Sequence, residues 1–305
     1  MKIEWSVVRH ETHKAFFSFT KNVGSENYLK TSGGIYVNSY RPVVRPVTDG
    51  ESAAVKKANE TWKDDAKSKV GRTSQGAVVG LQIRRGGKLE RVFRPEDLRH
   101  DDSVDCVLHR HFDATNVSRV QVVVNAETAG MKLHQMLNQN VQWGKAVTQW
   151  KVMSPDLGST GPDSAVIYFS VPLNDAKVIA TIGSLEKVLG DVLAPLNTPP
   201  FGLMTVSRGI YGADIPTEEQ QGQVLKMKRL DFGSAGTIIS RVITESAYRL
   251  ACNYLAGGAF NDSDTLASSE AWQKEFGKSK EALDQELKGE MKSLLSRELE
   301  WELVD

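Results

Sequence analysis

The sequence is poor in cysteine and has no long apolar run. Its 305 residues include only Cys106 and Cys252, which lie far apart. Neither belongs to a C-x-x-C pair, so a disulfide framework and a structural zinc site are both disfavoured, and a reducing compartment is favoured. No apolar stretch reaches the length of a membrane helix, and the first residues lack the apolar core of a signal peptide. We therefore expect a cytoplasmic protein with no membrane partner.

The chain also lacks an excess of charge of either sign. Its formal net charge is zero, and we expect no nucleic-acid partner. The charge is nevertheless uneven, because residues 1–125 are net positive and residues 215–305 net negative. The basic part could bind an anionic partner, or it could be an ordinary solvated surface. The "RRGG" run at 84–87 lies in no P-loop pattern and reads as a hairpin turn.

Strand and helix patterns alternate without a regular βαβ repeat, which predicts an α+β fold. Residues 1–50 read as short strands and turns. Strands are further predicted at 76–93 (a hairpin turning at Gly86-Gly87), 103–112, 118–125, 146–153, 164–171 and 202–214. Helices are predicted within 51–75, before Val141, at 173–193, at 233–255 with a stop at Gly257-Gly258, and in the tail at 280–305. The tail helix is amphipathic, so it should dock on the domain or on a partner.

One strand carries an unexpected amine. In "QWKV", Lys151 lies between Trp150 and Val152. Side chains alternate along a strand, so Trp150 and Val152 should point to one face and Lys151 to the other. A strand lysine is most often an exposed edge residue. A lysine on a well-packed strand could instead be a base held in a fixed position.

Several separated motifs resemble one family. "RVQVVVNAE", "AVTQWKV", "DSAVIYFS", "TPPFGLMTVSRGIYGAD" and "FGSAGTIISRVITESA" follow one another in order. They resemble the HopA-type family of type III secreted effectors, which also occurs in clusters that make lanthipeptides and thioamidated peptides. That family is distantly similar to the OspF and SpvC phosphothreonine lyases. These enzymes eliminate phosphate from phosphothreonine without a metal.

The resemblance implies a phosphothreonine-lyase-like core with a mixed or antiparallel sheet flanked by helices, and no cofactor. It covers residues 118–256. Residues 1–117 are then a β-rich region that could dock a partner or a peptide, and residues 257–305 are a linker followed by the amphipathic helix.

The resemblance also implies roles for individual residues. "QWKV" places the catalytic base at Lys151, and "VIYF" places a catalytic tyrosine at Tyr168. "TVSRGIY" places a phosphate-binding arginine at Arg208. The Lys-x-His strand of the lyases falls on "SRVQV", so Arg119 stands where a lysine binds phosphate and Gln121 where a histidine acts as the acid. This chain therefore departs from the family at the proton donor.

Two histidine motifs offer alternatives for that donor. "HRHF" places His109 and His111 on one face of a strand, as possible proton donors, as a metal pair without a third ligand, or as surface histidines. "MKLH" also spells Lys-x-His, but it lies in a predicted helix. Lys132 and His134 are therefore interpreted as helix-surface residues. No set of residues has the spacing of a metal site.

Three functions remain open. The first is a lyase that eliminates phosphate from phosphoserine or phosphothreonine in a precursor peptide, after a separate kinase has phosphorylated it. The second is a type III effector, secreted into a host cell, that acts on or binds a host protein. The third is a catalytically inactive binding module, which Gln121 keeps open. Residues 1–8 read as a strand rather than a polar, Ser-rich secretion segment, which favours the first function.

Overall fold

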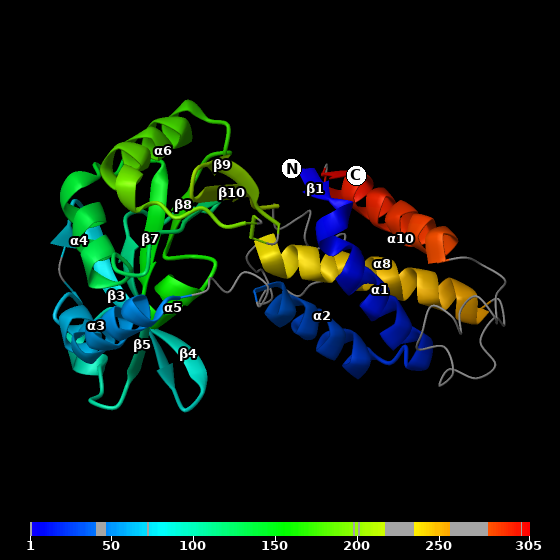
Figure 1. The fold of residues 1–305 in the computed structure, drawn as a ribbon, viewed down its shortest axis with the longest axis horizontal. Helices are drawn as coiled ribbons and strands as arrows, with labels where there is room; N and C mark the ends of the chain where they lie inside the picture. The colour runs from blue at the N-terminus through cyan, green and yellow to red at the C-terminus, as the bar shows by residue number, and fades with distance from the viewer. Residues whose placement is uncertain are drawn as a thin grey trace. The chain divides into compact units, whose positions relative to one another are not determined.

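The computed structural model describes residues 2–40, 47–71, 73–197, 199–200, 202–216, 235–256, 280–299 and 301–305. These residues form two compact units, one of residues 43–215 and one of residues 1–42 together with 216–305 (Figure 1). No described helix is long and apolar enough to cross a membrane.

The 43–215 unit is built on a nine-stranded sheet. Its strands run in the order β2-β3-β5-β7-β8-β6-β10-β9, and β4 pairs with β3 outside this path. Every pair in this sheet is antiparallel. The strands are β2 (Thr73–Ser74), β3 (Ala77–Arg85), β4 (Lys88–Val92), β5 (Ser103–Arg110), β6 (Ser118–Val122), β7 (Val147–Met153), β8 (Ala165–Phe169), β9 (Met204–Ser207) and β10 (Ile210–Asp214).

Helices cover one face of this sheet (Figure 1). The helices α4 (Met131–Asn140) and α6 (Ala176–Leu189) pack their apolar sides against β6, β7 and β8, and α3 (Asp49–Lys67) packs against β3, β4 and β5. A short helix, α5 (Pro155–Thr160), joins β7 to β8. Trp150 and Val152 are fully buried on the helix-covered face. Because side chains alternate, Lys151, which lies between them, is on the opposite face.

The second unit is mainly helical. Its helices are α1 (Trp5–Lys21), α2 (Ser25–Tyr40), α8 (Ala235–Ala256) and α10 (Lys280–Leu294), and a π-helical turn (Leu295–Leu299) follows α10. The two ends of the chain meet, because β1 (Lys2–Glu4) pairs in parallel with β11 (Glu302–Val304). Asp284 of α10 accepts hydrogen bonds from Trp5 at 3.2 Å, Arg9 at 2.7 Å and His13 at 2.8 Å, which joins α10 to α1.

The α+β class and the antiparallel sheet flanked by helices confirm the predicted fold. The hairpin turning at Gly86-Gly87 is also present, as β3 and β4. Three predictions differ from the structure. Residues 5–40 form α1 and α2 and not short strands, and residues 202–214 form the hairpin β9–β10 and not one strand. The predicted boundary after residue 117 is not a boundary, because β5 and β6 belong to one sheet. The predicted stop at Gly257-Gly258 and the linker to residue 279 lie outside the described residues.

The tail helix docks within its own unit and contributes to its core. Leu287 of α10 is fully buried. Leu287→Ala should therefore lower the free energy of unfolding of the helical unit by about 2–5 kcal/mol, because it leaves a cavity. Urea denaturation would measure this, with the exposed Lys292 of the same helix replaced by alanine as the control. Equal stability of the two variants would contradict the packing of α10.

Candidate functional site

The strand β7 has the two-sided pattern that its sequence predicts. Trp150 and Val152 are fully buried, whereas Gln149, Lys151 and Met153 are each partly exposed. The indole of Trp150 stacks on the ring of His109, with centroids 3.7 Å apart and planes 8° apart. This packing holds β7 in place from the helix-covered face of the sheet. The backbone that carries Lys151 is therefore held in one position.

The register of the sheet brings four of the predicted site residues to the face of Lys151. Lys151 pairs with Val166 of β8, and Val166 pairs with Gln121 of β6. Tyr168, two residues beyond Val166, pairs with Arg119. Directly paired residues in an antiparallel sheet share a face, and so do residues two apart along a strand. Lys151, Tyr168, Arg119 and Gln121 therefore form one group.

A fifth polar residue, Asp163, joins this group and was given no role by the sequence reasoning. It is partly exposed and lies in the loop just before β8. The side-chain amide nitrogen of Gln121 makes a long contact of 3.5 Å with its carboxylate. The Oε1 atom of Gln121 is buried and meets no hydrogen-bond donor among the described residues. The aspartate in "GPDS" was visible in the sequence, but only the path of the loop places it here.

The charges of this group set the protonation of Lys151. Burial lowers the pKa of Lys151, but the negative charge of Tyr168, Cys106 and Asp163, when ionised, outweighs burial and the opposing effect of Arg119, so the pKa is raised. A lysine must be neutral to act as a base, and this raised pKa favours its ammonium form instead. Burial raises the pKa of Asp163, and the charges of Lys151 and Arg119 offset only part of that.

A cavity of about 270 Å³ opens near Lys151, although Lys151 is not one of its lining residues. Its lining includes Leu108, which pairs directly with Lys151, and Gln149, which precedes Lys151 by two residues. Arg91 and Arg110 also line it. The cavity therefore adjoins the candidate base and carries two guanidinium groups, which suit an anionic ligand.

Arg208 lies outside the strands that carry this group. It is exposed in the turn that joins β9 to β10. The strand β10 is separated from β7 by β6 and β8, a lateral distance of roughly 14 Å at the usual strand spacing. The structure therefore places Arg119, and not Arg208, next to Tyr168 and Lys151.

The histidines lie on the other face of the sheet. His109 pairs with Trp150 in the register and stacks on it, so it shares the helix-covered face and points away from Lys151. His111 accepts a hydrogen bond from the indole nitrogen of Trp150 at 3.0 Å. Neither residue is placed to give a proton to a group bound at Lys151. Strand alternation explains this position. Leu108 pairs with Lys151 and shares its face, so His109, the next residue along β5, points to the other face.

His134 is not a surface residue, in contrast to our expectation. It is 3% exposed, and its Nε2 lies 2.9 Å from Nε2 of His109. Burial lowers the pKa of His109 to about 2, with the charges of His134 and His111 adding to it. Burial also lowers the pKa of His134 to about 4, together with the charge of Lys69. By contrast Lys132 is exposed and pairs with Glu127 at 3.6 Å.

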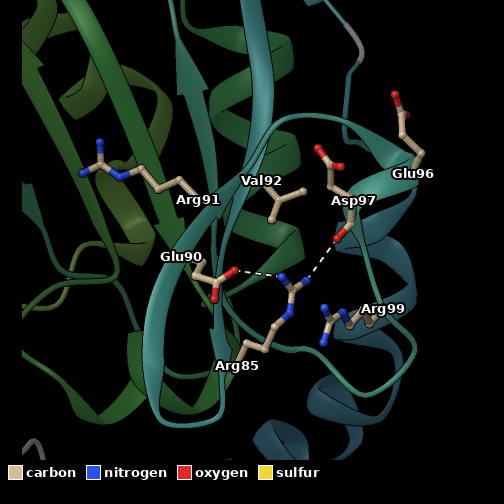
Figure 2. Close-up of a pocket in the computed structure, with 7 residues that line it drawn as sticks. All are labelled: Arg85, Glu90, Arg91, Val92, Glu96, Asp97 and Arg99. Atoms are coloured by element: carbon tan, nitrogen blue, oxygen red, sulfur yellow. Dashed lines mark hydrogen bonds and ion pairs between the residues drawn. The ribbon is translucent and has the colours of Figure 1, made fainter.

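A second hollow, of about 450 Å³, lies between β4 and residues 96–99, which follow it in the chain. Figure 2 shows Arg85 between Glu90 and the backbone oxygen of Asp97, at 2.8 and 3.0 Å. Arg85 also pairs with Asp102. The lining carries as many carboxylates as arginines and none of the predicted site residues. We assign it no part in the chemistry at Lys151. Within the described residues, no group of three or more His, Cys, Asp or Glu side chains could hold a metal ion.

Comparison with known proteins gives structural matches alone. No protein-family model and no curated protein matches the chain. An effector protein from Pseudomonas syringae pv. tomato strain DC3000 matches with 15% identity and a TM-score of 0.48, over 84% of this chain and 94% of its own. An effector from P. syringae pv. syringae strain 61 matches with 19% identity and a TM-score of 0.47, over 82% and 95%. The phosphothreonine lyase SpvC from Salmonella matches with 10% identity and a TM-score of 0.32, over 71% and 98%.

The matched structures therefore include effectors and phosphothreonine lyases, the two groups that the sequence motifs resemble. Scores below 0.5 leave the chemistry of this chain to be argued from its own residues.

Proposed function

We propose that this protein eliminates phosphate from phosphoserine or phosphothreonine in a peptide or protein, leaving a dehydroamino acid. The observation that carries the proposal is the grouping of Lys151, Tyr168 and Arg119 on one sheet face beside a cavity with two arginines. Such an elimination needs a base for the Cα proton, stabilisation of the enolate-like charge on the carbonyl, and cations for the phosphate.

The residues of the group divide these tasks. Lys151 takes the Cα proton, since it is the one lysine on this face of β7. The Tyr168 hydroxyl donates a hydrogen bond to the developing enolate. Arg119 supports the negative charge of the phosphate, and the cavity that Arg91 and Arg110 line receives the flanking residues of the substrate. No step in this scheme needs a metal.

Mass spectrometry of a panel of phosphopeptides tests the proposal. Elimination removes phosphoric acid and leaves a dehydroamino acid, whereas hydrolysis leaves the original hydroxyl, so the two products differ by one water. We expect the elimination product, with the same yield in the presence of a chelator. Hydrolysis, or a metal requirement, would rule the lyase out. Whether the substrate is a precursor peptide phosphorylated by a separate kinase or a host protein reached by secretion would follow from which panel members react.

One observation favours a second function, a phosphopeptide-binding module. The pKa of Lys151 is raised although burial opposes its charged form, and the carboxylate of Asp163 favours its ammonium form. An ammonium ion next to Arg119 would hold a phosphate without removing a proton. Tight binding of phosphopeptides without any change in their mass would establish this function instead.

The positions of the two arginines predict which of them binds phosphate. Arg119→Met keeps most of the side-chain volume and removes the charge, so phosphopeptide affinity should fall by roughly 10- to 150-fold, the loss of one charge-assisted contact. Arg208→Met is the matched control and should change affinity less than about threefold, because Arg208 lies in an exposed turn. Calorimetric titration would measure both. A larger loss for Arg208→Met would restore the assignment that the family resemblance implies.

A further inference from the structure

None of the three residues that the sequence offered as the proton donor, His109, His111 and Gln121, can serve the proposed elimination. Gln121 has no acidic proton to give, and His109, His111 and His134 lie on the other face of the sheet. Phosphate is a poor leaving group as a trianion, so a proton must reach its bridging oxygen as the Cβ–O bond breaks. The donor must therefore be sought on the face of Lys151.

The described groups near Lys151 that can exchange a proton are few. Arg119 stays protonated at any working pH. Cys106 is completely buried, and burial raises the pKa of its thiol to about 11. Tyr168 and Asp163 remain. Asp163 is partly exposed, it contacts Gln121, and its charge interacts with both Lys151 and Arg119.

We propose that Asp163 is the general acid of the elimination and that Gln121 positions it. This inference rests on the proposed function. Lys151 takes the Cα proton, the electron pair of that C–H bond forms the Cα=Cβ bond, and the Cβ–O bond breaks. The electron pair of the broken bond stays on the phosphate oxygen, which receives the proton of the Asp163 carboxyl. Hydrogen phosphate and the dehydroamino acid leave.

Each turnover ends with Lys151 as an ammonium ion and Asp163 as a carboxylate, which is the arrangement that their attraction favours in the unliganded protein. One proton transferred from the amine to the carboxyl restores the reactive arrangement, so nothing else is consumed. In this scheme the phosphate lies against Asp163, whereas Lys151 lies against the Cα proton. The phosphate dianion therefore raises the pKa of Asp163 more than that of Lys151, which promotes this transfer. Gln121 can serve both states, since a side-chain amide can donate to a carboxylate or accept from a carboxylic acid.

A change of leaving group separates an acid from a merely structural residue. A sulfoserine peptide has nearly the shape of a phosphoserine peptide, but sulfate leaves without needing a proton. Asp163→Asn should lower the rate of phosphate elimination by about 10²–10⁴-fold, the usual contribution of general acid catalysis, and the rate of sulfate elimination less than about tenfold. The exposed Asp191, replaced by asparagine, is the matched control and should change neither rate.

The pH profile gives an independent readout. In the wild type, the pair of Lys151 and Asp163 carries one proton between the two pKa values, so the rate should rise, stay level and then fall with pH. Without the carboxyl, only the free amine matters, and the rate of Asp163→Asn should climb steadily through neutral pH. Arg119, Tyr168 and Cys106 face the same pair and are unchanged in this variant.

The other outcomes overturn the inference in distinguishable ways. Equal losses with phosphate and sulfate would make Asp163 a structural residue. A loss confined to phosphate in Tyr168→Phe, with Asp163→Asn active, would make Tyr168 the acid. If the wild-type protein eliminates neither phosphate nor sulfate from any peptide, the proposed function itself fails. If the wild type eliminates phosphate and Asp163→Asn does so at the same rate, only the role of Asp163 fails.

Discussion

Replacing Lys151 by alanine is expected to lower the rate of phosphate elimination by about 10²–10⁴-fold, the usual contribution of a general base. Binding of the phosphopeptide should weaken less than about tenfold, because Arg119 and the cavity arginines remain. Lys151→Arg should be as inactive as Lys151→Ala, since a guanidinium group stays protonated and cannot take a proton. Turnover would be followed by mass spectrometry and binding by calorimetry.

The exposed Lys145, just before β7, provides the matched control. Lys145→Ala should retain wild-type turnover and binding. Wild-type turnover in Lys151→Ala would show that Lys151 is not the base. Loss of turnover in a natively folded His134→Ala variant would then indicate that "MKLH" is the catalytic motif, although His134 lies on the far face of the sheet. Tight binding with no turnover in the wild type would identify the binding module instead.

Strand alternation predicted the environment of Lys151 from sequence alone. Trp150 and Val152 are buried and Lys151 is partly exposed, as the period of two requires. The same rule assigns a face to each residue within one strand, but it does not say which strands are neighbours. The order β7-β8-β6-β10 is not the order of the sequence. The pairing of Arg119 with Tyr168, and the two strands that separate β10 from β7, therefore followed only from the structure.

Residues 5–21 show how a local propensity misled the prediction. "EWSVV" is rich in strand-forming residues, and strand propensity depends strongly on surroundings. The buried residues of α1 include Trp5, Val8, Thr12, Phe16 and Phe19, which recur every three or four positions. That helical period was present in the sequence and is the more reliable signal. His134 is a similar case, since it lies beside Leu133 and one turn before Leu137 on the buried side of α4.

Asp163 could not be predicted from any period, because it lies in a loop. The sequence indicates only that Gly, Pro, Asp and Ser interrupt two strands between residues 153 and 165. Its position over Gln121 depends on the pairing of β6 with β8, two elements that the chain reaches more than forty residues apart. Long-range pairing of this kind is what separates the predicted site from the observed one.

The buried histidines predict a loss of stability in mild acid. His109 and His134 have pKa values of about 2 and about 4 in the folded protein, because burial disfavours the charged imidazole. Their unfolded value is about 6.5. The unfolded chain therefore binds protons first as the pH falls, so the stabilisation is complete above about pH 6.5 and is lost progressively below it. At about pH 5 each residue should cost about 2 kcal/mol, a large part of a domain's stability of about 5–15 kcal/mol.

Urea denaturation of the full chain at about pH 7.5 and about pH 5 would measure this loss. The double variant His109→Asn, His134→Asn keeps polar groups at both positions but cannot titrate, so its stability should change about 4 kcal/mol less between the two pH values than that of the wild type. The exposed His100, replaced by asparagine, is the control and should behave as the wild type does. An equal pH dependence in the double variant and the wild type would show that groups other than this pair govern the response. The indole of Trp150 stacks on His109 and adjoins Lys151 in β7, so protonation of the pair should also disturb the strand that carries the proposed base, and activity should fall over the same pH range as stability.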